Sequence, residues 1–184
     1  MEITKTRYSV NIAFAILASM LLSGFCTAMP ATTDVVVTKS RASDSANASV
    51  NTSLPRFHSV SQAVAYIESH ESQKDKVWTV FVNEGIYRER VVINTDNVHL
   101  VGQSQETTTI VFDRYAGQKV AENSSEKWGT RRTATVEILG DNITLENITI
   151  INDFDYPGNE VKAKDDPTRL SGTQAVARKT GVNS

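Results

Sequence analysis

Cysteine is almost absent from this sequence. The 184 residues contain a single one, Cys26, and because a disulfide needs two, the chain cannot cross-link itself. Cys26 also lies in a segment that we expect to be removed during export. The mature protein would therefore enter an oxidising compartment without disulfides, and its stability must come from packing and backbone hydrogen bonds.

Neither sign of charge dominates, and aromatic residues are scarce. The formal net charge is −2 and the pI is near 5.9, so there is no basic stripe to neutralise the phosphates of a nucleic acid. Aromatic residues make up 7% of the chain, against 40% for all hydrophobic residues. Aliphatic side chains must therefore supply most of the core. His58, His70 and His99 lack the spacing of a metal site, and we expect no bound metal.

The chain also lacks an apolar run long enough for a comfortable membrane span. Its longest run covers residues 10–22 and follows a basic start. The small residues at 26–28 (Cys-Thr-Ala) suit a signal peptidase, so residues 1–28 are expected to be a signal peptide. A lipoprotein signal is the alternative, although bulky Phe25 fits it badly. A cleaved signal predicts a secreted protein without membrane attachment, extracellular or, in a Gram-negative host, periplasmic.

Residues 29–54 are rich in Ala, Ser, Thr and Asn and contain few large apolar side chains. They show neither helical nor strand periodicity. Such a segment cannot bury enough apolar surface to offset the entropy lost on ordering. We therefore expect a disordered linker over 29–54 and one folded domain over 55–184.

The domain is expected to open with a short amphipathic helix that Ser59 or Ser61 could cap. Its apolar residues follow the i, i+3, i+4, i+7 spacing of one helical face: Val60, Ala63, Val64 and Ile67.

Short β-branched runs separated by turn residues follow this helix. They cover 77–82, 90–93, 97–102, 107–112, 134–140 and 142–150. Strands this short and frequent are typical of an all-β solenoid, sandwich or barrel. A weak repeat favours the solenoid, because Asn97 and Asn142 each precede a segment of alternating apolar residues. Asn at such positions suits a corner, where its side chain can hydrogen-bond the turn.

Six segments, in order, resemble the pectinesterase (pectin methylesterase) family. The resembling segments are an entry helix at 57–64, a strand with G-x-Y-x-E at 80–89, a coil at 98–103 and 109–111, a G-T-x-x-S-A-T-like stretch at 129–136, strands at 140–152, and Q-A-V-A at 174–177. The resemblance implies an all-β fold: a right-handed parallel β-helix, here an incomplete solenoid with a short N-terminal helix.

The resemblance also implies a function. Members of this family hydrolyse the methyl esters of galacturonate in pectin, which modifies plant cell walls and needs no metal or organic cofactor. One Asp acts as nucleophile, a second as acid and base, and glutamines stabilise the oxyanion. Gln174 matches an oxyanion-stabilising, substrate-binding glutamine, and Thr130 matches a threonine that contacts substrate. A purely structural turn is the alternative for Thr130.

The aspartate motifs of this family lie beyond Q-A-V-A and do not occur in this sequence, which ends at Ser184, and Arg178 stands where the family has Leu. We therefore expect a truncated member that is inactive alone, monomeric if folded, and poorly soluble because its last coil would be exposed. A non-catalytic polysaccharide-binding β-helix is the alternative function, and an interaction solenoid without affinity for sugars is a third.

Several other polar and aromatic residues invite interpretation. Asp153, Asp155, Asp165 and Asp166 are interpreted as solvated loop charges rather than a cation site or a catalytic pair. Gly85 and Tyr87 are interpreted as structural, and Trp78 as a core residue. Trp128, in a polar loop, could stack on a sugar ring.

Overall fold

The computed structural model describes residues 29–39, 53–70, 73 and 75–180. The predicted signal peptide, 1–28, lies outside these residues. The elements in chain order are β1 (Val35–Val37), β2 (Arg56–Phe57), α1 (Val60–Glu68), β3 (Trp78–Val82), β4 (Gly85–Arg88), β5 (Val91–Ile93), β6 (Val98–Gly102), β7 (Thr108–Phe112), α2 (Gly129–Arg132), β8 (Val136–Ile138), β9 (Thr144–Glu146), β10 (Thr149–Asn152), α3 (Tyr156–Glu160) and β11 (Arg178–Thr180). None of the helices in this part of the chain has the length and apolar character needed to cross a bilayer.

The strands form three parallel sheets, and the chain visits the sheets in turn. The sheet orders are β2-β1-β3-β6-β9 (sheet A), β4-β7-β10 (sheet B) and β5-β8-β11 (sheet C). The first coil is therefore β3, β4 and β5, the second β6, β7 and β8, and the third β9, β10 and β11. Every pairing between these coils is parallel. This is a parallel β-helix, as the short strands and the weak repeat predicted.

The core consists of side chains stacked in columns between the sheets. In sheet A, Val80 pairs with Leu100 and both are fully buried. In sheet B, Tyr87 is likewise fully buried and Ile110 beneath it is 1% exposed. Each full burial of such a side chain contributes about 1.5–3 kcal/mol. Stacked aliphatic columns thus replace the missing disulfides and aromatic residues.

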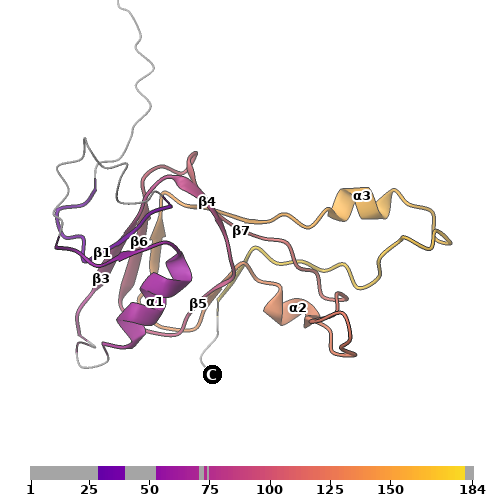
Figure 1. Cartoon of the computed structure of the whole chain (residues 1–184), viewed down its shortest axis with the longest axis horizontal. Helices are drawn as coiled ribbons and strands as arrows, with labels where there is room; N and C mark the ends of the chain where they lie inside the picture. Colours follow the sequence, from indigo (N-terminus) through magenta and orange to yellow (C-terminus); the bar gives the residue numbers. More distant parts are fainter. Residues whose placement is uncertain (1–28, 40–52, 71–72, 74, 181–184) are drawn as a thin grey trace, which may run out of the picture.

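Helix α1 covers the interior at the start of the solenoid, where it contacts β1, β2, β3 and β5 (Figure 1). The four residues predicted for its apolar face are the four that are buried. Ser59 caps it by accepting a hydrogen bond from the Gln62 N–H, so the first of the two predicted caps is correct. The carboxylate of Glu89 accepts hydrogen bonds from the Val60 and Ser61 N–H groups, each at 2.9 Å, which satisfies donors that a helix otherwise leaves unpaired.

The prediction of a disordered linker over 29–54 is wrong for its first part. Val35, Val36 and Val37 form β1, which lies between β2 and β3 and is at most 1% exposed. Three consecutive valines can all be buried when a strand is covered on both faces, so this short run offsets its ordering cost. The folded domain therefore includes β1 rather than starting at 55. Residues 40–52 lie outside the described part of the chain.

Asparagines occupy corners of the coils, as predicted for Asn97 and Asn142. A further asparagine corner divides the predicted strand 142–150 into two strands. Asn97, Asn142 and Asn147 adopt left-handed backbone angles, with φ of 59°, 56° and 53°. Asn142 also donates from its Nδ2 to Oδ1 of Asn97 at 2.6 Å, so equivalent corners of successive coils are joined. Asn147 bends the 142–150 run into β9 and β10. A Cβ at Gly102 would lie 2.1 Å from the Asn147 carbonyl oxygen, so only glycine fits there.

The G-x-Y-x-E segment is structural, as predicted. Tyr87 is fully buried and donates its hydroxyl to the Asn83 carbonyl at 2.9 Å. Burial and, to a smaller extent, the charge of Glu89 raise the pKa of Tyr87, so the ring stays neutral. Trp78, predicted to be a core residue, is 6% exposed.

Candidate functional site

The long loops of this solenoid all leave from the same corner, between sheets B and C. The first coil crosses this corner with residues 89–90 alone, whereas the second uses residues 113–135 and the third uses residues 153–177. The two long loops carry α2 and α3 and reach away from the stacked strands on one side (Figure 1). Thr130 lies in the first loop and Gln174 in the second, although they are far apart in sequence.

Backbone hydrogen bonds bring the segments that carry these two residues together. The Ala116 N–H donates to the Gln174 carbonyl at 2.9 Å, and the Ala116 carbonyl accepts from the Gly129 N–H at 2.9 Å. The Gly117 N–H donates to the Gly172 carbonyl at 2.7 Å. Residues 116–118 therefore run between the Thr130 segment and the Gln174 segment. A Cβ at Gly117 would lie 2.0 Å from the Ser171 carbonyl oxygen, so this close approach requires glycine.

Both predicted site residues are exposed on these loops. The backbone carbonyl of Gln174 is held by the Ala116 N–H, and the residue itself is exposed. The Thr130 carbonyl accepts hydrogen bonds from the Thr133 hydroxyl at 2.7 Å and from the Thr133 N–H at 3.3 Å. Thr130 is thus a turn residue through its backbone, and its hydroxyl remains a candidate for substrate contact. The oxyanion and substrate roles of the pair stay predictions.

Trp128 precedes α2 and is held by aromatic packing. Its ring lies edge-on to Phe112, with centroids 5.5 Å apart, and the Arg114 guanidinium lies 6.0 Å from its centroid. The half-buried indole is therefore oriented by β7. Stacking of this ring on a sugar stays a prediction.

Sequence reasoning missed a buried carboxylate on the outer face of sheet C. Glu137 is 7% exposed and pairs in register with Val92 of the first coil and Lys179 of the third. Its carboxylate contacts Arg90 at 2.5 Å and Lys179 at 2.9 Å, and Arg131 of α2 lies at 3.6 Å. Desolvation alone would raise the pKa of Glu137, but the hydrogen bond from Lys179 and the charges of the three cations outweigh it and lower the pKa.

We call Glu137, Arg90, Arg131 and Lys179 the sheet C charge cluster. It joins the three coils through Arg90, Glu137 and Lys179, and Arg131, the residue after Thr130, extends it to α2. Glu137 lies within the run 134–140 that was predicted to be a strand, but only the stacking register shows which cations meet it.

Three of the four aspartates at 153–166 have structural partners. Asp153 pairs with Arg88 at 3.1 Å, and Asp155 caps α3 by accepting from the Gly158 N–H at 2.9 Å. Hydrogen bonds from the Thr168 side chain and backbone lower the pKa of the exposed Asp166. These contacts agree with solvated loop charges. Within the residues that the structure describes, no three His, Cys, Asp or Glu side chains are grouped so as to hold a metal ion.

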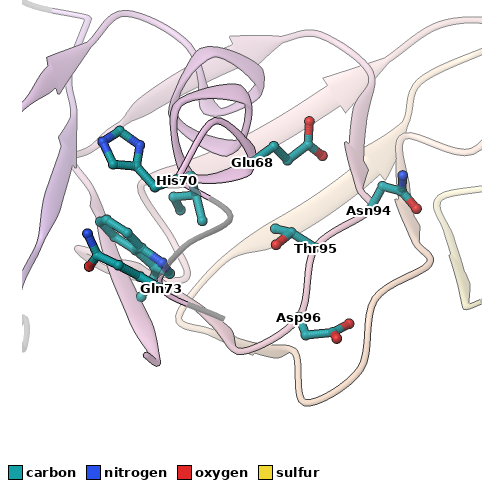
Figure 2. A pocket seen from close by; sticks show the side chains of 8 residues that line it. Glu68, His70, Gln73, Asn94, Thr95 and Asp96 are labelled. Carbon is teal, nitrogen blue, oxygen red and sulfur yellow. The ribbon is translucent and has the colours of Figure 1, made fainter. Parts of the chain in front are cut away.

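A hollow of about 310 Å³ lies elsewhere, at the end of α1 (Figure 2). It is lined by Ile67, Glu68, His70, Gln73, Trp78, Asn94, Thr95 and Asp96, and by no residue of the long loops. Two of its polar side chains have structural partners: Asp96 accepts from the Asp141 N–H at 2.7 Å, and His70 Nδ1 lies 2.7 Å from the Tyr66 carbonyl oxygen. The loops at the corner between sheets B and C therefore make the better candidate site.

Fold and site together define a class of protein: a parallel β-helix with exposed polar residues on long loops at one corner. The pectinesterase family model matches residues 48–162, and the chain belongs to this family. Its relatives establish the handedness, so the fold is a right-handed parallel β-helix, as the resemblance implied.

The similar proteins are pectinesterases of known sequence or structure. Pectinesterase A of Dickeya dadantii is 35% identical over 100 residues, which cover 54% of this chain and 27% of the relative. A pectin methylesterase solved with a hexasaccharide is 30% identical, with a TM-score of 0.67, covering 82% of this chain and 40% of that one. The Yersinia enterocolitica pectin methylesterase is 38% identical, with a TM-score of 0.61, covering 70% and 38%. The chain thus spans well under half the length of these relatives.

Proposed function

We propose that this chain is the amino-terminal part of a secreted carbohydrate esterase that hydrolyses galacturonate methyl esters in pectin. Family membership supports the esterase class. A similar pectin methylesterase binds a hexasaccharide, which supports a polysaccharide chain as the ligand. The observation that carries the proposal is the backbone pairing through Ala116, which fixes Gln174 and Thr130 on neighbouring loops.

In this proposal the chain supplies the oxyanion side of the reaction. The exposed amide of Gln174 donates a hydrogen bond to the oxyanion that forms when the ester carbonyl is attacked, and the Thr130 hydroxyl contacts the same polymer. A donor placed in this way typically contributes about 10²–10³ in kcat. The nucleophilic and acid–base aspartates of the family are not among these 184 residues, so the chain by itself is expected to be inactive.

The test joins this chain to the coils of the Dickeya dadantii relative that it does not cover. The chimera should release methanol from methylated pectin, whereas the 184-residue chain alone should not. In the chimera, Gln174→Ala should lower kcat by about 10²-fold or more. Gln105→Ala, at an exposed turn of the second coil, is the matched control and should change nothing.

Other outcomes would contradict the proposal in different ways. Methanol release by the 184-residue chain would overturn its expected inactivity. A folded chimera that binds pectin but releases no methanol would favour the non-catalytic polysaccharide-binding function instead. Full activity of the Gln174→Ala chimera would remove the oxyanion role.

A further inference from the structure

An amide side chain lies at the end of β10, where both long loops of the candidate site begin or end. Asn152 is the last residue of β10 and is in register with Phe112, the last residue of β7. It follows Ile150 by two positions, so both side chains point to the interior face of sheet B. Asn152 is partly buried there. A polar side chain that turns inward needs hydrogen-bond partners within the protein.

The Asn152 amide binds both ends of the loop between β7 and β8. Its Nδ2 donates to the Arg114 carbonyl and to the Thr133 carbonyl, each at 2.9 Å. These two bonds use both hydrogens of the amide nitrogen. Arg114 lies two residues before Ala116, which pairs with the second loop. The Thr133 hydroxyl and N–H donate to the Thr130 carbonyl. The amide therefore holds both segments of this loop that lead to the candidate site.

The same amide contacts both ends of the loop between β10 and β11. Its Oδ1 accepts a hydrogen bond from the Phe154 N–H at 3.1 Å. Its Nδ2 lies 3.5 Å from the Val176 carbonyl oxygen, and one residue separates Val176 from Gln174. Carbonyl oxygens only accept and the Phe154 N–H only donates, so one orientation of the amide serves all of these contacts.

Asparagine suits this position because the nearby hydroxyls are already used. Thr133 and Thr135 are fully buried, and their hydroxyls donate to the carbonyls of Thr130 and Ile151. A hydroxyl has one hydrogen to donate, so neither threonine can take the place of the Asn152 amide. An aspartate would have the same shape as Asn152, but it would present acceptors to carbonyl oxygens.

We propose that Asn152 is a positioning residue: its single amide sets the spacing of the two long loops and thereby aligns Gln174 with Thr130. Asn152 itself touches no substrate in this proposal. The alignment of the loops is a property of the fold, whereas its effect on catalysis rests on the proposed function, because it acts through Gln174. An oxyanion donor that is displaced loses part of its effect on kcat.

The first test measures amide hydrogen exchange in the full 184-residue chain and needs neither substrate nor activity. Asn152→Asp keeps the shape and the acceptor for the Phe154 N–H but removes both donors. The Ala116 and Gly117 amides, which donate to the second loop, should exchange about tenfold faster, on the scale of one lost hydrogen bond. The amides of β3 and β6 should change less than twofold. Asn152→Ala, which adds no charge, should give the same pattern.

Asn142→Asp is the matched control, because it makes the same chemical change at another corner of the solenoid, where Asn142 donates to Asn97. It should leave the exchange of Ala116 and Gly117 within twofold of the wild type. Equal acceleration in the Asn142 and Asn152 variants would overturn the positioning role and leave the esterase proposal standing.

Two further results of the exchange test would count against the proposal. Unchanged exchange at Ala116 and Gly117 in both Asn152 variants would show that the amide does not hold the loops together. Circular dichroism checks that each variant is folded. Loss of the folded state in both Asn152 variants would make Asn152 a residue of general stability and would also overturn the positioning role.

The second test uses the chimera and separates positioning from general stability. Asn152→Asp should lower kcat about tenfold when Gln174 is present, and less than twofold when it is combined with Gln174→Ala, because residues that act through one another are not additive. An equal loss of kcat in both backgrounds would show that Asn152 does not act through Gln174 and would overturn the proposal. A chimera without activity would contradict the proposed function, while the exchange of Ala116 and Gly117 would still decide whether Asn152 holds the loops.

Discussion

The two ends of this solenoid are built differently. At the amino-terminal end, α1 places four buried residues over the interior, and β1 and β2 extend sheet A beyond the first coil. At the other end, β9, β10 and β11 are the outermost strands of the three sheets. The apolar residues of this coil, Ile143, Leu145, Ile148 and Ile150, are only partly buried.

The columns show this difference position by position. In sheet A, Val80 and Leu100 are fully buried, whereas Leu145 below them is half-buried. In sheet C the column ends in polar residues: Arg178 is in register with the buried Val136 and is itself exposed. The last coil is thus held less by packing than by edge pairing and by the bond between Lys179 and Glu137. The contrast between the covered end and the open end of the solenoid shows that each coil depends on its neighbours for burial.

The largest effect is expected from a matched pair within one column. Leu100→Ala removes a fully buried side chain and should lower the free energy of unfolding by about 2–5 kcal/mol. Leu145→Ala, in register with it, should cost about 1 kcal/mol or less because solvent already reaches that residue. Urea titration of both variants measures the difference, and equal losses would show that the third coil is as well packed as the second.

A smaller loss is expected when the covered end is loosened. Glu89→Ala leaves the Val60 and Ser61 N–H groups at the start of α1 without their carboxylate and should cost about 1–3 kcal/mol. Glu84→Ala, an exposed position in the same coil, is the control and should stay within about 0.5 kcal/mol. Thermal melting compares the two, and an unchanged midpoint for the Glu89 variant would mean that this contact does not secure α1.

Charge on the open end should reduce self-association. Ile150→Lys places an ammonium among the half-buried residues of the third coil and should lower the association constant about tenfold, since open strand edges and apolar surface drive such contacts. Val161→Lys, at an 85% exposed residue after α3, is the control with the same chemical change. Sedimentation velocity measures the association constants of both variants. If Val161→Lys lowers the association constant more than Ile150→Lys does, self-association proceeds through the loop after α3 rather than through the open end.

The smallest effect concerns pH and the cluster that anchors β11. The pKa of Glu137 in the folded chain is lowered, so its stabilising contribution is present above the ordinary carboxyl pKa and lost as pH falls through the folded pKa. Glu137→Gln should therefore cost on the order of 1 kcal/mol at neutral pH and less near pH 3. Urea titrations at both pH values measure this, with Glu126→Gln in an exposed pair as the control. A cost that does not change with pH would exclude the charge as its source.

Local patterns in the sequence predicted much of the fold. The apolar spacing in 60–67 located α1 and its buried face, because helical periodicity is a property of the segment itself. The β-branched runs located the strands of the coils other than β4 and β11, and the repeat at Asn97 and Asn142 correctly indicated equivalent corners. The motifs also placed Gln174 and Thr130 in a common family pattern before any contact between their loops was known.

What the sequence missed depends on distant partners. The run Val35–Val37 has no periodicity and sits among small polar residues, and only its place between β2 and β3 makes it a strand. The sequence around Glu137 does not predict that three cations contact its carboxylate, because Arg90 and Lys179 belong to other coils. The register that places the exposed Arg178 beside the buried Val136 is equally invisible until the coils are stacked.

Local features of the sequence were thus enough to predict most strands of the coils and the family, since periodicity, turn residues and ordered motifs belong to short segments. Tertiary structure alone decided which end of the solenoid is covered, that the loops of Thr130 and Gln174 meet at Ala116, and that Glu137 gathers excess positive charge. Each of these depends on the register between coils, in which residues distant along the chain stack as neighbours.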